Sequence, residues 1–380
     1  MTGGVESILA AHARLLRKAG HEVRIIAGRG EAEIVPELDS RQPEVEALAA
    51  GLAEGEFDSS SFEQLRSGLK RSLEPLLADR DVAIAHNLLT MPFNLPAAAA
   101  LLDTGQRLLA WTHDLAWVNP RYAAYKHRGW PWSMLCEAQR GVRYVAISGL
   151  RQRQITHTFG LQPRQVPVVP NGIDLTGFLG ISGSTQRLLE KAGLSRADPL
   201  VLVPLRITPR KRLELAIEAA GLLQNRLPSL GVLVTGPLGP HSPDNLEYAK
   251  HLLELRGSLG LDDVVAFCFE QAGDQHPVSD ANVAELYRLA DAVLLPSESE
   301  GFGLPVLEGG LARSPVVCTD LEVLKEVGGG GIWTFPAKAG AEAVAAAVSA
   351  ALASRAARLR RRVRRQYSWG SVLNRLERLL

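Results

Sequence analysis

The chain has 380 residues, which is enough for two domains of ordinary size. Its hydrophobic fraction of 46% and charged fraction of 22% are those of a globular protein with a buried core. The 42 Lys and Arg residues are balanced by 41 Asp and Glu residues, and this near-zero net charge argues against bulk electrostatic binding of nucleic acid.

The three cysteines, Cys136, Cys268 and Cys318, are scattered and form no CxxC pair. A disulfide framework or a zinc site is therefore not expected, and this cysteine usage fits a reducing compartment. No apolar run reaches the 18 residues that a membrane-spanning helix needs. We expect a cytoplasmic protein without a signal peptide or a transmembrane segment.

The first half of the chain alternates helices with short apolar strands. Apolar residues at helical spacing predict a helix over 5–19, ended by Gly20, and the composition of 45–80 is also helical. A shorter helix is expected at 97–102. The strands predicted in this half are residues 23–27, 82–85, 107–111, 144–147 and 166–169.

The pattern restarts after a polar stretch of small residues at 180–185. The strands predicted in this half are residues 200–204, 232–235, 264–269, 292–295 and 316–319. The helices predicted in this half are residues 213–223, 248–259, 283–290, 305–312 and 341–352. Strands that are apolar on both faces are typical of parallel sheets covered by helices.

Two such arrays predict an α/β protein with two doubly wound, Rossmann-like domains that face a cleft. We expect the N-terminal domain at 1–178 and the C-terminal domain at 179–360. In this architecture ligands bind beyond the carboxyl ends of the strands, and most of the polar segments below lie at such ends.

The start of the first domain departs from this pattern. A doubly wound domain begins with a strand that lies centrally in its sheet, whereas residues 1–4, Met-Thr-Gly-Gly, are already the turn into the first helix. We therefore expect the first domain to lack its first strand. The natural chain would then begin ~10–25 residues upstream, or the chain has been trimmed.

The strongest functional signal is the segment 296–308, which follows a predicted strand. Glu300 lies in the turn after that strand, and Glu308 lies one turn inside the next helix. Gly301 and Gly303 allow the backbone to approach a ligand closely. The free N–H groups at the helix start can hold an anion or a sugar hydroxyl. Two carboxylates facing one cleft can accept hydrogen bonds from sugar and ribose hydroxyls.

Four basic residues crowd the turn that follows the strand at 200–204. They are Arg206, Arg210, Lys211 and Arg212. Cations are disfavoured at a helix N-terminus by the helix dipole. An anionic ligand such as a diphosphate, held by charge and by forked arginine hydrogen bonds, therefore explains them better than a solvated helix start.

Polar residues also end the strands of the first domain. His86 and Asn87 follow one strand and His113 follows the next, so contact with a ligand is one interpretation and a structural role is the other. Trp117 begins an aromatic cluster that can stack on sugar rings or fill a core, and the sequence leaves both open. The glycines at 3–4 and Gly236 are weaker signals, because turn geometry also explains them.

Other chemistries lack their motifs. The sequence has no HExxH, no GxSxG and no Walker lysine loop, and no Asp-x-Asp follows a strand. A protein-bound metal is therefore not indicated.

Residues 355–365 hold seven arginines and predict a helix with a basic, solvated face. Peripheral contact of this helix with anionic membrane lipid is the alternative.

On these motifs the whole chain resembles glycosyltransferase family 4, the retaining group 1 glycosyltransferases with the GT-B fold. The resemblance rests on the spacing of Glu300 and Glu308 and on the pair Arg206 and Lys211. Three further segments also match: Gly-Gly-Val-Glu at 3–6, Pro-Asn-Gly-Ile-Asp at 170–174, and Tyr-Ser-Trp at 367–369. It implies a C-terminal helix at 361–380 that crosses back to the first domain. The residues 309–315 and 236–241 depart from the family pattern.

The resemblance implies that a hexose passes from a nucleotide-diphosphate sugar to a hydroxyl acceptor with retained anomeric configuration. Glu300 would bind sugar hydroxyls, Glu308 would bind the ribose, and Arg206 and Lys211 would stabilise the leaving diphosphate. His113 would contact the sugar near the reacting centre. The remaining donor-side residues would be Gly4, Gly236, Gly301, Phe302, Gly303 and Leu304. On the acceptor side we place His86, Asn87 and Trp117.

We expect no cofactor beyond the donor substrate, and a small-molecule, glycan or lipid-linked acceptor. Two alternatives stay open from the sequence. One is a nucleotide-sugar epimerase or isomerase of the same fold, which would need an acid/base set across the sugar. The other is a non-catalytic protein that binds nucleotide sugars.

Overall fold

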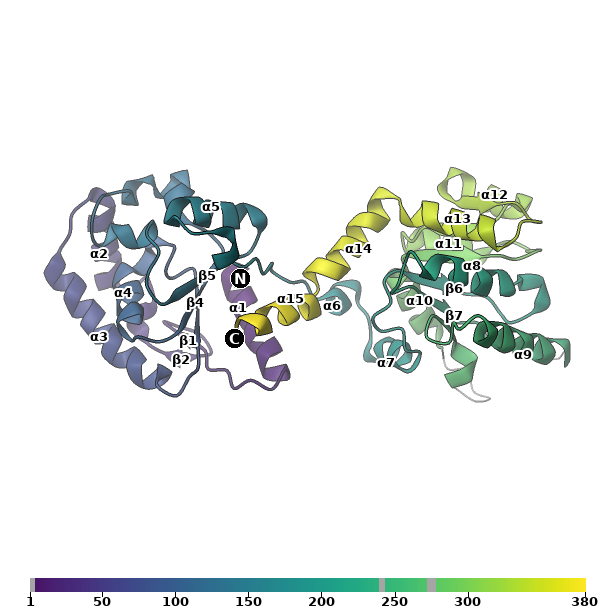
Figure 1. Ribbon diagram of the computed structural model, residues 1–380, viewed down its shortest axis with the longest axis horizontal. Coiled ribbons are helices and arrows are strands. Elements are labelled where there is room, and N and C mark those ends of the chain that lie inside the picture. Colours follow the sequence, from purple (N-terminus) through teal and green to yellow (C-terminus); the bar gives the residue numbers. More distant parts are fainter. Residues whose placement is uncertain (1–3, 239–242, 272–277) are drawn as a thin grey trace. The chain divides into compact units, whose positions relative to one another are not determined.

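The computed structural model describes residues 4–238, 243–271 and 278–380, and it divides into two compact units. Unit 1 comprises Met1–Gly172 and Trp369–Leu380, and unit 2 comprises Ile173–Ser368 (Figure 1). The expected boundaries lay at 178 and 360, whereas this division groups 173–178 and 361–368 with unit 2. Among the described residues, no helix combines the length and hydropathy needed to cross a membrane.

The main sheet of unit 1 consists of β3 (Ala83–His86), β4 (Leu108–Thr112) and β5 (Val142–Ala146). These strands are parallel and lie in the order β3-β4-β5. A separate parallel pair is formed by β1 (Ile26–Ala27) and β2 (Glu33–Ile34). The expected strand over 23–27 is therefore only two residues long.

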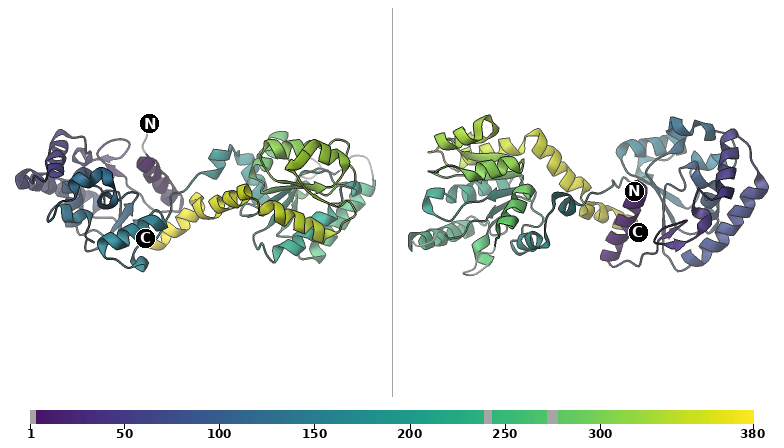
Figure 2. Two further views of the ribbon diagram at one scale, coloured as in Figure 1. Left: turned by 90° about the horizontal axis from the view of Figure 1, so that it is seen from above. Right: turned by 180° about the vertical axis from the view of Figure 1, so that it is seen from behind.

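Helices cover both faces of the β3-β4-β5 sheet. They are α1 (Gly4–Lys18), α3 (Ser59–Leu77), α4 (Leu95–Asp103), α5 (Gly149–Phe159) and α15 (Trp369–Leu376), while α2 (Pro43–Glu54) packs against α3 and α4. Successive residues of β4 face opposite sides: Leu109 and Trp111 pack with α1 and α15, whereas Leu108 and Ala110 pack with α3, α4 and α5. In Figure 2, α1 and α15 lie side by side.

One expectation for unit 1 is refined and another was wrong. The helical stretch 45–80 is divided into two helices, because Gly55, at φ +85°, ends α2 and the Asp58 side chain caps α3. The expected strand at 166–169 is reduced to one bridge between Ala146 and Val168. Pro167 has no N–H group, so at this position the segment can pair with β5 only through the Pro167 carbonyl.

Unit 2 contains one six-stranded parallel sheet. Its strands are β6 (Leu200–Val203), β7 (Gly231–Val234), β8 (Val265–Phe267), β9 (Ala292–Leu295), β10 (Val316–Thr319) and β11 (Trp333–Phe335). Their order in the sheet is β11-β10-β9-β6-β7-β8. The chain therefore runs outward from β6 through β7 and β8, and then returns to the other side of β6 through β9. The point where the order reverses lies between β6 and β9.

Nine helices belong to the described part of unit 2. They are α6 (Leu175–Leu179), α7 (Gly183–Lys191), α8 (Glu214–Gln224), α9 (Pro243–Ser258), α10 (Asp280–Leu289), α11 (Leu304–Leu311), α12 (Glu322–Gly328), α13 (Ala341–Leu352) and α14 (Arg355–Tyr367). One continuous hydrophobic core joins the sheet to helices α7–α13. The predicted strands of this half are all present, whereas β11, α6, α7 and α12 were not predicted.

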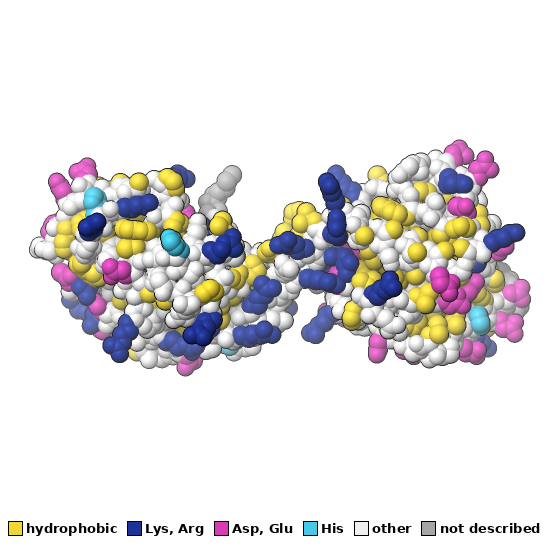
Figure 3. Space-filling view, turned by 45° about the horizontal axis from the view of Figure 1, so that its top comes forward, with side chains coloured by type: hydrophobic (Ala, Val, Ile, Leu, Met, Phe, Trp, Pro, Cys, Tyr) yellow, Lys and Arg dark blue, Asp and Glu magenta, His cyan; other side chains and the backbone are white. Residues whose placement is uncertain are grey.

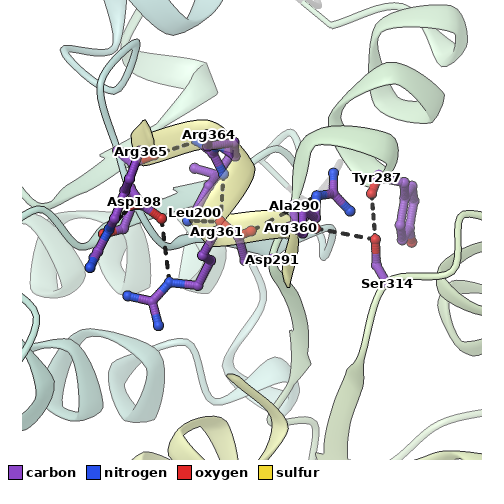
Figure 4. Close-up of polar contacts among 11 residues, drawn as sticks. Asp198, Leu200, Tyr287, Ala290, Asp291, Ser314, Arg360, Arg361, Arg364 and Arg365 are labelled. Carbon is purple, nitrogen blue, oxygen red and sulfur yellow. Dashed lines mark hydrogen bonds and ion pairs between the residues drawn. The ribbon is translucent and has the colours of Figure 1, made fainter. Parts of the chain in front are cut away.

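The arginine-rich helix α14 packs on unit 2 through two aspartates (Figure 4). Arg364 donates to Asp291 at 2.5 Å, and Arg361 donates to Asp198 at 3.3 Å. Arg360 and Arg365 contact the same two aspartates. The expected basic, solvated face is therefore only part of this helix, since the Arg361 and Arg364 side chains are only 16% and 19% exposed.

The rest of the α14 surface remains basic. Arg355, Arg358 and Arg362 are exposed. On the face shown in Figure 3, basic side chains gather along the part of unit 2 formed by α14, whereas most acidic side chains in view lie elsewhere on that unit. Membrane contact through these exposed arginines stays a prediction.

Candidate active site

The candidate site of unit 2 lies where the strand order reverses. The loop after β6 carries the basic turn 204–212, and the loop after β9 carries residues 296–303. Because β6 and β9 are parallel neighbours, both loops leave the same edge of the sheet. Glu298 N–H donates to the Arg210 carbonyl at 2.9 Å, and Arg210 Nη1 donates to the Ser299 carbonyl at 3.1 Å. The two loops are thus joined directly.

Lys211 and Glu300 meet at this junction. Lys211 Nζ lies 2.5 Å from Glu300 Oε1, and the two side chains are only 8% and 11% exposed. Ser297, which is fully buried, donates its hydroxyl to the same oxygen at 2.6 Å. Two candidate residues from separate sequence motifs therefore lie in contact, largely out of water, at the carboxyl ends of two neighbouring strands.

The four basic residues of the turn have different surroundings. Only Lys211 is buried. Arg210 joins the two loops, and Arg212, at φ +50°, donates to the carbonyls of Ala337 and Ala339. Arg206 is exposed, and its guanidinium forms no ion pair with the described residues. Arg206 is therefore the cation of this turn that other parts of unit 2 leave most available to a ligand, whereas Lys211 is held by Glu300.

The two glycines before α11 differ in whether a residue with a side chain could replace them. Gly303 adopts φ +95°, and a Cβ there would lie 2.5 Å from Leu324 Cδ2. Glycine is therefore needed for both backbone conformation and space. A Cβ on Gly301 would meet nothing within 4 Å. Phe302 and Leu304 are 53% and 60% exposed, so this turn presents open surface at the start of the helix.

Glu308 is oriented by a buried tyrosine. Tyr287 in α10 is 2% exposed, and its hydroxyl donates to Glu308 Oε2 at 2.6 Å. Burial, and then the charge and hydrogen bond of Glu308, raise the pKa of Tyr287 far above its usual value. The phenol therefore stays a neutral donor, and it fixes one oxygen of a carboxylate that is itself exposed.

Gly236, just after the neighbouring strand β7, lies against the basic turn. A Cβ on Gly236 would come within 1.9 Å of the Leu205 carbonyl oxygen, so no other residue fits without a backbone shift. Ile207 N–H donates to the Pro237 carbonyl at 3.0 Å. Residues 239–241 of this loop and Gly3 lie outside the described residues.

Unit 1 brings three of its candidates together. His86 Nδ1 and His113 Nε2 are 3.0 Å apart, and the two rings are stacked. Asn87, at φ +60°, accepts the backbone N–H groups of His113 and Asp114 at 2.8 and 3.0 Å. Burial lowers the pKa of His113 to about 4 and also lowers that of His86. Both imidazoles are therefore neutral at ordinary pH.

The other candidates of unit 1 have simpler surroundings. Trp117 is partly buried between two hydrophobic clusters, so core packing accounts for much of its surface. Gly4 begins α1, and a Cβ there would meet nothing within 4 Å. Their predicted roles at a ligand stay predictions.

Sequence reasoning missed the hydroxyls that hold the two glutamates. Ser297 stood inside the segment 296–308 but carried no assigned role, and Tyr287 was not singled out. Ser297 could have been found from its place directly after a buried strand. Tyr287 offers no such signal, because its contact with Glu308 depends on how α10 packs beside α11.

Comparison with known proteins decides the family. Residues 184–367 match the model for glycosyl transferases group 1, and residues 2–176 match that for glycosyltransferase family 4. A D-inositol 3-phosphate glycosyltransferase of Salinispora arenicola is 30% identical over 332 residues, which cover 83% of this chain and 71% of the relative. The chain belongs to the group 1 glycosyltransferases of family 4. This family membership and the parallel α/β units give it the GT-B fold.

Other relatives of this glycosyltransferase carry the same name. The enzyme of Frankia alni is 29% identical over 87% of this chain and 81% of its own, whereas that of Salinispora tropica is 34% identical over only 45% of its own length. Among solved structures, a glycosyltransferase from Rickettsia africae aligns over 100% of this chain and 94% of its own, with 19% identity and a TM-score of 0.39.

Proposed function

We propose that this glycosyltransferase moves a hexose from a nucleotide-diphosphate sugar to a hydroxyl acceptor with retention of configuration. The observation that carries the proposal is the buried Lys211–Glu300 pair where the order of the unit 2 strands reverses. In open α/β sheets this is the place where nucleotides bind. A cation and a carboxylate held there suit a diphosphate and the hydroxyls of a sugar.

Each residue then has a role that follows from its chemistry. Lys211 and the exposed Arg206 neutralise the diphosphate as it leaves, and the N–H groups at the start of α11 add donors. Glu300 accepts hydrogen bonds from sugar hydroxyls. Glu308, held by Tyr287, accepts those of the ribose. Catalysis rests on positioning and charge stabilisation, so the reaction needs no bound metal.

The roles of His113, His86, Asn87 and Trp117 rest on the family resemblance. A neutral His113 suits contact with a sugar hydroxyl, since an uncharged imidazole both donates and accepts hydrogen bonds. The relatives are named for D-inositol 3-phosphate, so a polyol phosphate is the first acceptor to test.

The test is an incubation of the chain with labelled nucleotide sugars and candidate acceptors, D-inositol 3-phosphate first. The expected products are free nucleoside diphosphate and a glycoside with the donor's anomeric configuration, read by chromatography and NMR. An isomerised donor would point to an epimerase, and binding without turnover would point to a non-catalytic protein. Either result would overturn the proposal, and an inverted glycoside would overturn retention.

The residue assignment is tested by Lys211→Met, Glu300→Gln and the double variant. Each single variant leaves one buried charge without its partner, which costs about 3–5 kcal/mol of stability. The double variant removes both charges and restores stability, but we expect it to lose ~10²–10³-fold in kcat. Lys191→Met, at an exposed position on α7, is the matched control and should keep full activity. An active double variant would refute the assignment.

A further inference from the structure

Two histidines of unit 1 meet at the carboxyl ends of neighbouring strands. His86 is the last residue of β3, and His113 directly follows β4. His86 Nδ1 lies 3.0 Å from His113 Nε2, the ring centroids are 5.3 Å apart, and the ring planes differ by 22°. Each nitrogen lies within one bond length of its ring centre, so these values require the two nitrogens to face each other along the line between the centroids. A ring N–H points straight away from its ring centre, and the contact is therefore a nearly straight hydrogen bond.

The backbone of His113 is held from the same strand end. Asn87 follows His86, and its side-chain oxygen accepts the N–H groups of His113 and Asp114 at 2.8 and 3.0 Å. Asp114 in turn lies 2.9 Å from the guanidinium of Arg151, in the first turn of α5. The loops after β3, β4 and β5 are thus tied together, and the His113 ring reaches His86 from a fixed backbone.

The ring of His86 is itself packed among other rings. Its centroid lies 6.0 Å from that of Trp111, its partner in the register of β3 and β4, and 5.4 Å from that of His12. Burial lowers the pKa of His86 well below its usual value and lowers the pKa of His113 to about 4. At neutral pH each imidazole therefore carries a single ring proton, and the bond between them joins two neutral groups.

The two atoms that face each other decide which ring donates. A neutral imidazole has one N–H donor and one acceptor nitrogen, and in water the form protonated at Nε2 is the more stable. With both rings in that form, His113 Nε2–H donates to the lone pair of His86 Nδ1. The reverse bond would force both rings into the less stable form, with the proton on Nδ1. The geometry therefore favours His113 as the donor and His86 as the acceptor.

We infer that His86 is a positioning residue that holds His113 as the Nε2–H tautomer and leaves His113 Nδ1 as a hydrogen-bond acceptor. The hydrogen bond made by one ring nitrogen sets the protonation of the other. His113 is partly exposed, and His86 acts on a ligand only through it. For the reaction this role rests on the proposed function, in which an acceptor at Nδ1 selects a hydroxyl hydrogen and disfavours a carbonyl or phosphate oxygen.

The test reads the tautomer of His113 by NMR of the full chain with isotope-labelled histidine. Long-range proton–nitrogen correlations distinguish a protonated ring nitrogen from an unprotonated one, and His113→Gln identifies the signals of His113. In the native chain we expect Nε2 to be protonated and Nδ1 to be free of a proton. In His86→Phe, which keeps an aromatic ring and removes the acceptor, we expect a mixture of the two tautomers. A native His113 protonated at Nδ1, or a single tautomer that persists in His86→Phe, would overturn the inference.

Two further variants separate the hydrogen bond from packing. His86→Asn offers an amide oxygen near the position of Nδ1 and should restore the single tautomer. His12→Phe alters a buried ring of the same cluster whose nitrogens have no hydrogen-bond partner among the described residues, and it should leave the tautomer of His113 unchanged. Equal mixtures in His12→Phe and His86→Phe would show that packing sets the tautomer, and the role of His86 would be wrong.

A transfer assay on the same chains tests the consequence for the reaction. We expect kcat to fall about five- to tenfold in His86→Phe, as for the loss of one hydrogen bond between neutral groups, and to recover in His86→Asn. The affinity for the nucleoside diphosphate, which is assigned to unit 2, should not change. An unchanged kcat in His86→Phe would refute the role of the tautomer in transfer. If the native chain transferred no sugar while the tautomers behaved as expected, the proposed function would fail and the positioning of His113 by His86 would stand.

Discussion

At the scale of single residues, the site of unit 2 shows how hydroxyls position acids. Both glutamates that the sequence singled out are held by a buried hydroxyl, Glu300 by Ser297 and Glu308 by Tyr287. Each hydroxyl engages one carboxylate oxygen and restricts the rotation of the side chain. A restricted carboxylate loses less conformational entropy when a ligand binds.

This positioning predicts the effect of Tyr287→Phe. The phenyl ring keeps the volume of the buried side chain, so the fold should persist, while Glu308 loses its hydrogen bond. We expect donor binding to weaken about tenfold, since a hydrogen bond to a charged group contributes about 1.5–3 kcal/mol. Titration calorimetry with the nucleoside diphosphate measures this directly.

The matched control is Tyr248→Phe. Tyr248 is a partly buried tyrosine of unit 2 that is hydrogen bonded to a different glutamate, Glu214. Its substitution should lower stability and leave donor affinity unchanged. Equal affinity losses in both variants would mean that Tyr287 acts only through stability.

At the scale of elements, the sequence predicted where the strands lie in the chain better than it predicted which strands are neighbours in the sheet. Apolar runs such as 200–204 and 292–295 identify buried strands because both faces must be covered. The turns after them, with Lys211 and Glu300, could be placed at one sheet edge from the fold class alone. That β6 and β9 are neighbours could not be read from the sequence, since strand order depends on long-range packing.

The missed elements have local causes. The β11 strand has only three residues, which are too few to show a hydrophobic period. The α12 helix is short and contains Glu and Lys, two residue types that are equally common in a solvated loop. The buried contacts of α14 were not predicted, because a run of arginines looks solvated unless its partners are known. Asp198 and Asp291 lie just before β6 and β9, far away in sequence from the arginines that they bind.

The α14 contacts predict that Asp291→Ala destabilises unit 2. Asp291 is fully buried; it accepts from Leu200 N–H at 2.9 Å and from Arg364 at 2.5 Å. Its removal leaves arginines without their partner, and we expect a loss of about 3–5 kcal/mol. Urea denaturation measures the loss. Glu322→Ala, at an exposed position at the start of α12, should change stability by less than about 0.5 kcal/mol, and equal losses in the two variants would contradict the α14 account.

At the scale of the whole molecule, each unit has its own hydrophobic core. Most described core residues of unit 2 form one cluster confined to Ile173–Ser368. Within that unit, arginines of α14 form ion pairs with aspartates just before the amino ends of β6 and β9. The candidate site lies at the carboxyl ends of the same strands. Stability and donor recognition are therefore assigned to opposite ends of the same two strands.

This separation predicts that a fragment of residues 173–368 folds alone and keeps the donor half of the site. Its core, its sheet and the α14 contacts all lie inside those bounds. We expect one cooperative unfolding transition, raised by a saturating nucleoside diphosphate. At one hundred times Kd the stabilisation is about 2.7 kcal/mol, which is several degrees for a domain of this size. Calorimetry with and without ligand provides the measurement.

The same fragment with Lys211→Met and Glu300→Gln should fold equally well and show little shift. A fragment that unfolds without cooperativity, or an equal shift in the double variant, would show that donor recognition needs more of the chain than unit 2 supplies.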